Sequence, residues 1–157
     1  MLGLRQQPGR VALMFMRMPL RAYAHDQGRL LGHTFLQFTH AGRTSGKAYR
    51  TVAMVLDFDE ITSEAVICAA WDTDWFRNVQ ARPASNVKID RLSFTPVQRF
   101  LTEEEAFAVV RRFRAAHRHR VALISRLFGW GDLADDRKVR AFVRAHPFVA
   151  FRPATSG

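Results

Sequence analysis

A short basic loop at residues 42–47 carries the clearest chemistry in the sequence. It reads Gly42-Arg43-Thr44-Ser45-Gly46-Lys47, and Arg50 follows three residues later. Glycine lets the backbone turn tightly and approach a ligand closely, and exposed N–H groups in such a turn can form an anion-binding nest. Arginine adds a fork of donors and lysine a point charge, which suits a phosphate or a carboxylate. The loop therefore predicts a binding site for an anionic cofactor.

The same loop is also compatible with a polar hairpin whose charges are only solvated, since short basic turns are common. It is not a P-loop, because that motif has four residues between its glycines and Ser or Thr after the lysine. Here three residues separate Gly42 from Gly46, and Ala48 follows Lys47. Taken alone, the loop leaves both interpretations open.

Other common catalytic and metal-binding patterns are absent or weak. His117 and His119 are two apart on an expected helix and so face different ways, and the six histidines form no recognisable ligand set. No Gly-x-Ser-x-Gly elbow presents a nucleophile. We therefore expect no metal site, and we assign no catalytic residue.

Length and composition indicate one packed domain, since 157 residues with 48% hydrophobic content can bury a core without stabilisation by disulfide bonds or a metal ion. The single cysteine, Cys68, excludes an internal disulfide and favours a buried thiol in a reducing, cytoplasmic setting. The net charge of +10 suggests nucleic-acid binding. However, the basic residues are spread over nearly every segment and no nucleic-acid-binding signature appears, so no such partner is expected.

Residues 1–30 form a basic segment that we expect to be helical and to belong to the same domain as residues 31–157. Its apolar run, Val11–Met16, is too short to span a membrane. A basic segment with Met and Phe is compatible with peripheral contact with the inner face of an anionic membrane. Packing on its own domain is the more common role of such a helix.

Apolar periodicity predicts the elements that must position the loop. Extended runs flank it, and Val52, Met54, Leu56 and Phe58 alternate as in one half-buried strand. Further strands are expected at 64–70, near Val87–Ile89, within 94–101 and at 147–153, with helices at 71–83, 102–116 and 132–146. Residues 102–105 form a capping box, and the helix that follows is expected to bury Ala106, Val109, Val110, Phe113 and Ala116. This order predicts an α+β domain, a small and mostly antiparallel barrel of five or six strands that carries helices.

Taken together, these segments resemble the deazaflavin (F420)-dependent nitroreductase family, whose members are split β-barrel oxidoreductases with an FMN-binding-like fold. The likeness covers most of the chain and is strongest at residues 42–47 with Tyr49-Arg50-Thr51. It resumes at residues 74–83, Asp-Trp-Phe-Arg-Asn-Val-Gln-Ala-Arg-Pro, which are similar to the family's Trp-x-x-Asn-Leu-x-Ala-x-Pro segment.

The resemblance implies that the basic loop holds the phosphate of coenzyme F420. Carried over residue by residue, the phosphate contacts would be Arg43, Thr44, Ser45, Gly46, Lys47 and Arg50. The deazaflavin ring would lie at a strand-to-helix corner near Ala70, Trp71, Trp75 and Asn78. Because the coenzyme supplies the hydride, the protein would orient it and exclude water. The C-terminal half has no Tyr, whereas some family members place Tyr beside the substrate.

Three functional hypotheses follow. The first is an F420-dependent reductase that transfers a hydride to a hydrophobic acceptor such as a quinone, an enone or a nitroaromatic. The second keeps the barrel and replaces F420 with FMN. The third is a non-catalytic basic module on a membrane or nucleic acid, whose salt-dependent binding would survive loss of Arg43 and Lys47. The sequence does not indicate the oligomeric state, and a dimer is compatible with it.

Overall fold

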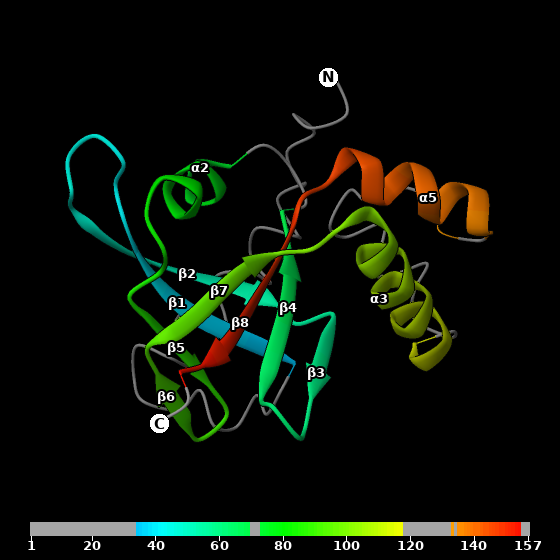
Figure 1. Ribbon diagram of the computed structural model, residues 1–157, viewed down its shortest axis with the longest axis horizontal. Coiled ribbons are helices and arrows are strands. Elements are labelled where there is room, and N and C mark those ends of the chain that lie inside the picture. Colours follow the sequence, from blue (N-terminus) through cyan, green and yellow to red (C-terminus); the bar gives the residue numbers. More distant parts are fainter. Residues whose placement is uncertain (1–33, 70–72, 118–132, 134, 155–157) are drawn as a thin grey trace, which may run out of the picture.

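The computed structural model describes residues 34–69, 73–117, 133 and 135–154. Within these ranges the chain forms two four-stranded antiparallel sheets and three helices (Figure 1). The expected α+β barrel with flanking helices is thereby confirmed. The predicted helical segment at 1–30 lies outside the described residues, as do Ala70 and Trp71.

The first sheet carries the basic loop. Its strand order is β2-β1-β5-β6, with β1 at Phe35–Ala41, β2 at Ala48–Met54, β5 at Asn86–Ile89 and β6 at Leu92–Phe94. β1 and β2 form the predicted hairpin, in which His40 lies opposite Tyr49 and Phe38 opposite Thr51. Opposed residues of an antiparallel pair share one face of the sheet, and His40 and Phe38 are two apart on β1, so all four project from the same face.

The second sheet has the strand order β3-β4-β8-β7, with β3 at Asp57–Asp59, β4 at Glu64–Cys68, β8 at Phe148–Pro153 and β7 at Pro96–Phe100. Four successive residues of β8, Phe148–Phe151, are buried. A strand that is covered on both faces reads as a continuous apolar run. The same cause explains the unbroken Ala65-Val66-Ile67 of β4.

An apolar core lies on each face of the second sheet. The core between the sheets contains Leu36, Phe38, Val87, Ile89, Ala65, Ile67, Val149 and Phe151. The core between the second sheet and the helices contains Val66, Phe148, Ala150, Val109, Phe113, Leu133, Val139 and Phe142. Burial raises the pKa of the Cys68 thiol, which packs against this second core. The predicted inert cysteine is consistent with that environment.

The helices cover opposite ends of the barrel. α2, Asp74–Ala81, lies near the β1–β2 hairpin, whereas α3, Glu103–Ala116, and α5, Asp136–Ala145, lie side by side at the other end (Figure 1). The capping box at the start of α3 is confirmed by reciprocal hydrogen bonds between Thr102 and Glu105. The predicted burial of Ala116 is wrong, because this last residue of α3 is exposed at the end of the helix.

Two stretches that were expected to be continuous strands are instead divided between the sheets. The single strand predicted through Val52–Phe58 is wrong: the N–H of Val55 donates to Thr34 O beside β1, and the N–H of Leu56 donates to Val66 O in β4. Likewise, β6 ends at Phe94 in the first sheet and β7 begins at Pro96 in the second. The described residues therefore contain eight strands, more than predicted, since alternation does not report which sheet a strand joins.

No helix in the described ranges has both the length and the apolar character that a membrane crossing requires.

Candidate functional site

An open cleft of about 490 Å³ lies between the β1–β2 hairpin and the first turns of α2. This volume falls within the range of about 300–1,000 Å³ that is typical of small-molecule sites. The cleft is lined by His40, Gly42, Arg43, Thr44, Ser45, Tyr49, Arg50, Thr51, Thr73, Asp74, Trp75 and Asn78.

The basic loop is closed by its own backbone. The N–H of Gly42 donates to Lys47 O and the N–H of Gly46 donates to Gly42 O, both at 2.8 Å. Gly46 has φ +72°, a conformation that glycine adopts without strain. A Cβ at Gly42 would lie 2.7 Å from Ser45 Oγ and 3.2 Å from Tyr49 Cε2. The two glycines therefore allow a compact loop that presents Thr44 and Ser45 at the cleft.

Arg43 joins the loop to α2. Its backbone N–H and its Nη1 both donate to Asn78 Oδ1, at 3.1 and 2.9 Å. Its Nη2 donates to Asp74 Oδ1 at 3.2 Å. The Asp74 side chain is 82% exposed, and such exposed ion pairs contribute only about 0–1 kcal/mol. The buried amide of Asn78 is therefore the stronger anchor of the guanidinium.

His40 contacts the Asn78 amide through the nitrogen that Arg43 does not use. Its Nδ1 is 3.2 Å from Asn78 Nδ2 and its Nε2 is 2.8 Å from Thr51 Oγ1. The ring stacks on Tyr49 with a centroid distance of 5.8 Å and an interplanar angle of 26°. Burial lowers the pKa of His40, because an imidazolium would lose hydration there. The residue is therefore neutral near pH 7.

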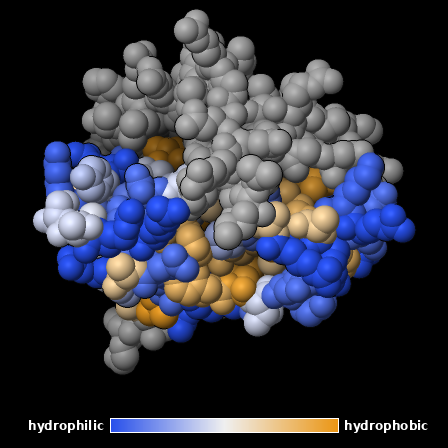
Figure 2. Space-filling model, turned by 90° about the horizontal axis from the view of Figure 1, so that it is seen from above, coloured by the Kyte–Doolittle hydropathy of each residue, from blue (hydrophilic) through white to orange (hydrophobic). Residues whose placement is uncertain are grey.

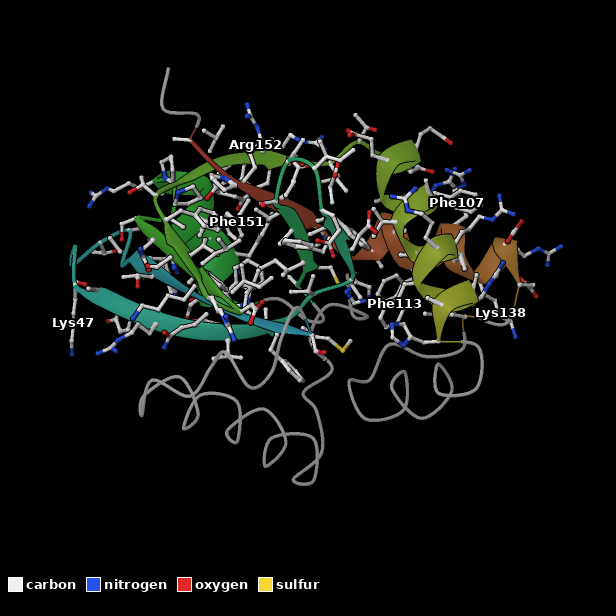
Figure 3. All side chains as sticks on the ribbon, turned by 90° about the horizontal axis from the view of Figure 1, so that it is seen from below. Lys47, Phe107, Phe113, Lys138, Phe151 and Arg152 are labelled. Atoms are coloured by element: carbon white, nitrogen blue, oxygen red, sulfur yellow. The ribbon has the colours of Figure 1, made fainter. Side chains whose placement is uncertain are left out.

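The remaining cations of the hairpin differ from Arg43. Arg50 lines the cleft, and no described residue forms an ion pair with it. Lys47 does not line the cleft. It lies at the outer end of the hairpin, on the opposite side of the molecule from Phe107 and Phe113 of α3 (Figure 3), and its Nζ is 5.8 Å from the centre of the Tyr49 ring.

The α2 wall combines apolar and polar groups. Trp75 packs edge-on against Phe38 with a centroid distance of 5.1 Å, which holds its indole at the cleft. Thr73 precedes the helix, and its buried Oγ1 has no hydrogen-bond partner among the described residues. Guanidinium groups, hydroxyl groups and the Trp75 indole thus line the same cleft. Such a donor set fits a ligand with a phosphate group and a planar ring.

The predicted site residues fall into three groups. Those at the cleft are Arg43, Thr44, Ser45, Arg50, Trp75 and Asn78. Gly46 and Lys47 belong to the loop but do not line the cleft, while Ala70 and Trp71 lie outside the described residues.

Sequence reasoning did not assign His40, Tyr49, Thr51, Thr73 or Asp74 to the site. The pairing of His40 with Tyr49 could have been predicted from the sequence. Counting outward from the loop in a simple hairpin register places these two residues opposite each other. Their contact with Asn78 depends on the packing of α2, which no local pattern reports. Among the described residues, no three His, Cys, Asp or Glu side chains gather in a way that would hold a metal ion.

Comparison with known proteins identifies the fold. No protein-family model and no curated protein matches this chain. A solved structure described as F420-H2 dependent reductase (FDR-A) matches with a TM-score of 0.50 and 17% identity, covering 76% of this chain and 95% of its own. A chain described as a domain-swapped dimer matches with a TM-score of 0.50 and 16% identity, covering 85% of this chain and 98% of its own.

A pyridoxamine 5'-phosphate oxidase-related, FMN-binding protein from Nostoc punctiforme aligns with a TM-score of 0.40 and 14% identity, over 96% of this chain and 83% of its own. At the identities of the first two structures, the shared property is the fold, and this chain is a split β-barrel of the same architecture.

Proposed function

We propose that the protein is an F420-dependent reductase that passes a hydride from reduced deazaflavin to a hydrophobic acceptor such as a quinone, an enone or a nitroaromatic. The observation that carries this proposal is the cleft, which is lined by Arg43, Arg50, the loop hydroxyls of Thr44 and Ser45, and Trp75. The fold shared with an F420-H2 dependent reductase adds support. When bound, the coenzyme would supply the hydride, and the protein residues would bind and orient it.

The basic loop would hold the phosphate of the coenzyme. Arg43 is oriented by Asn78, and a guanidinium has five N–H donors, so donors remain beyond those used in the protein. Arg50 has no carboxylate partner among the described residues, so none of these would compete with an anion for its charge. The hydroxyls of Thr44 and Ser45 would complete the contacts. Among the described residues, Asp74 is the only acidic one that lines the cleft, so the two arginines outnumber the described carboxylates there.

The α2 wall would position the ring. Trp75 is fixed by its edge-on contacts with Phe38 and Phe76, so it offers a rigid apolar surface. Ala70 and Trp71 remain proposed contacts on the basis of the family resemblance alone. No side chain is assigned as a proton donor, because positioning and water exclusion are the contributions that the described residues can make.

A binding titration tests the cofactor. Oxidised and reduced F420, and FMN in parallel, are titrated against the purified protein while ligand fluorescence is followed. We expect saturable F420 binding that weakens strongly when Arg43 and Lys47 are both changed to Ala, with the circular dichroism spectrum unchanged. Retention of FMN instead, with no response to F420, would overturn the cofactor assignment. Binding of nucleic acid or anionic vesicles that survives the double substitution would favour the non-catalytic module.

The dimer, the cytoplasmic location and membrane contact through residues 1–30 remain proposals. The words "domain-swapped dimer" describe one matched structure, and they motivate a measurement of the mass of this protein in solution by light scattering. Sedimentation with anionic vesicles, before and after deletion of residues 1–30, tests the membrane contact.

A further inference from the structure

We propose that His40 and Asn78 are positioning residues that orient the Arg43 guanidinium toward the anion. They do so through a chain of hydrogen bonds in which Arg43 donates to Asn78 and Asn78 donates to His40. Only neutral His40 can accept the last of these bonds. The part of this inference that concerns the anion rests on the proposed function. The chain itself rests on contacts between four side chains from β1, β2, the basic loop and α2.

The direction of the chain follows from Arg43. Its backbone N–H and its guanidinium can only donate, so the Asn78 atom that faces both must be the acceptor Oδ1. The amide orientation of Asn78 is thereby fixed, and Nδ2 must point toward His40 Nδ1. Because Nδ2 can only donate, Nδ1 must be unprotonated. The proton of neutral His40 then resides on Nε2 and is donated to Thr51 Oγ1.

Burial raises the cost of breaking the hydrogen bonds of the chain. Asn78 and His40 are each only 4% exposed, so a hydrogen bond broken between them is not replaced by water. The other support of the Arg43 guanidinium is Asp74, whose carboxylate is largely exposed. Loss of the Asn78 anchor would therefore leave Arg43 with a weak, solvent-screened partner and several available orientations.

Protonation of His40 conflicts with this arrangement. A proton on Nδ1 would face the N–H of Asn78, donor against donor. Rotation of the amide would present Oδ1 to His40, but Nδ2 would then face the two donors of Arg43. No amide orientation satisfies both neighbours, so an imidazolium at position 40 would break at least one hydrogen bond of Asn78. The proposal predicts that the anchor of Arg43 is weakened as a result.

The charged and titratable groups around the chain set the direction of the pH effect. The cations Arg43 and Arg50 line the same cleft and disfavour the imidazolium, Asp74 of α2 favours it, and Tyr49 of β2 stacks on the ring. Burial also lowers the pKa of His40. Simple Coulomb attraction predicts that anion affinity rises as His40 gains charge. The chain predicts the opposite, a loss of affinity below about pH 6.5, so the sign of the effect separates the two.

The test of the chain compares the wild type with His40→Asn, His40→Ala and Asn78→Asp. His40→Asn retains an acceptor close to the position of Nδ1 but cannot be protonated. The dissociation constant of F420 is measured from pH 5 to 8 and expressed as the ratio of variant to wild type at each pH, which cancels titration of the coenzyme. His117→Asn, the same substitution at the C-cap of α3 and outside the cleft, is the matched control.

We expect the dissociation constant of His40→Asn, relative to that of the wild type, to fall from pH 7.5 to pH 5, because only the wild type gains a proton at position 40. His40→Ala should bind roughly five- to tenfold more weakly at pH 7.5, the loss expected when a buried amide N–H has no acceptor. His117→Asn should follow the wild type throughout. A flat ratio for His40→Asn, or wild-type binding that strengthens toward pH 5, would overturn the proposal while leaving the proposed function intact.

A second measurement needs no ligand. In ¹⁵N NMR spectra the His40 resonances, assigned by their loss in His40→Asn, should show an unprotonated Nδ1 and a protonated Nε2. Asn78→Asp still offers oxygens to Arg43 but has no N–H for His40, so the pKa of His40 should rise in that variant. The opposite tautomer, or an unchanged pKa in Asn78→Asp, would refute the chain. If F420 fails to bind at any pH, the proposed function fails and this measurement alone decides the chain.

Discussion

Two arginine-rich regions of the molecule use the same side chain in different ways. Beside α3 and α5, carboxylates meet the arginines in the pairs Arg99–Glu64, Arg99–Glu105, Arg112–Asp57, Arg114–Asp136, Arg140–Glu104 and Arg144–Glu103. At the β1–β2 hairpin the described residues include one carboxylate that lines the cleft, Asp74, and none of them forms an ion pair with Arg50. Hydrophilic side chains gather at both ends of the face shown in Figure 2, with a hydrophobic band between them.

The two regions differ in whether their arginines are paired with carboxylates. Arginines that are matched by carboxylates are neutralised within the protein and contribute modestly to folding. Arginines that are grouped without carboxylates repel one another, and that repulsion is relieved when an anion binds. The net charge of +10 therefore does not describe either region. The local balance of charge among the described residues differs between them, and it supports the proposal that an anion binds at the hairpin end.

The largest effect is expected from Arg50→Ala. Removal of a cation that contacts a phosphate costs about 1.5–3 kcal/mol, so F420 should bind roughly ten- to a hundredfold more weakly. The free energy of unfolding should stay within about 0.5 kcal/mol of the wild type, because no described residue pairs with Arg50. Fluorescence titration and urea denaturation measure the two quantities. Unchanged affinity would place Arg50 outside the anion site and remove the contrast between the regions.

Arg99→Ala should show the reverse pattern. Arg99 donates from Nε and Nη2 to both oxygens of Glu64, at 3.1 and 2.8 Å, and from Nη1 to Glu105. The pairs are partly exposed, so the loss of unfolding free energy should be about 1 kcal/mol, visible as a lower urea midpoint. F420 affinity should be unchanged, and a weaker affinity would show that the two regions are coupled.

A smaller effect is expected in acid. The Arg99 guanidinium, followed by the Thr102 N–H, lowers the pKa of Glu105. A carboxyl with a lowered folded-state pKa contributes stability above its unfolded pKa, and that contribution is lost as pH falls through the folded value. The window therefore lies below about pH 4.5. Glu105→Gln should flatten the decline of the thermal midpoint in this window, whereas Arg50→Ala should leave it as steep as in the wild type.

The smallest effect is expected from Lys47→Ala. Lys47 is exposed at the hairpin tip and does not line the cleft, so a screened charge is all that is lost. F420 affinity should fall by less than about threefold by the same fluorescence titration. A loss as large as that of Arg50→Ala would show that the loop closes over the anion.

Local patterns were sufficient for much of the fold. The hairpin was predictable because a glycine-containing loop separates two alternating runs, and α3 because residues 102–105 form a capping box. Arg43 and Arg50, which both line the cleft, could be grouped from the sequence because they lie within eight residues of one another. The crossing at Val55–Leu56 was not, since the period-two pattern continues through a change of sheet. The roles of His40 and Asn78 were not predictable either, because their contact is made by packing between residues 38 positions apart.

The passage of the chain from the first sheet to the second at Val55–Leu56 affects how the hairpin can unfold. Adjacent peptide groups, Val55 and Leu56, donate to different sheets, so β2 cannot detach from β1 without straining the contact between Leu56 and β4. Val55 is also buried between the sheets. Amide hydrogen exchange at these two positions should therefore proceed by the same opening event and at matching protection. The hairpin end would then unfold with the barrel as one cooperative unit, which keeps the cleft rigid up to the temperature at which the whole domain melts.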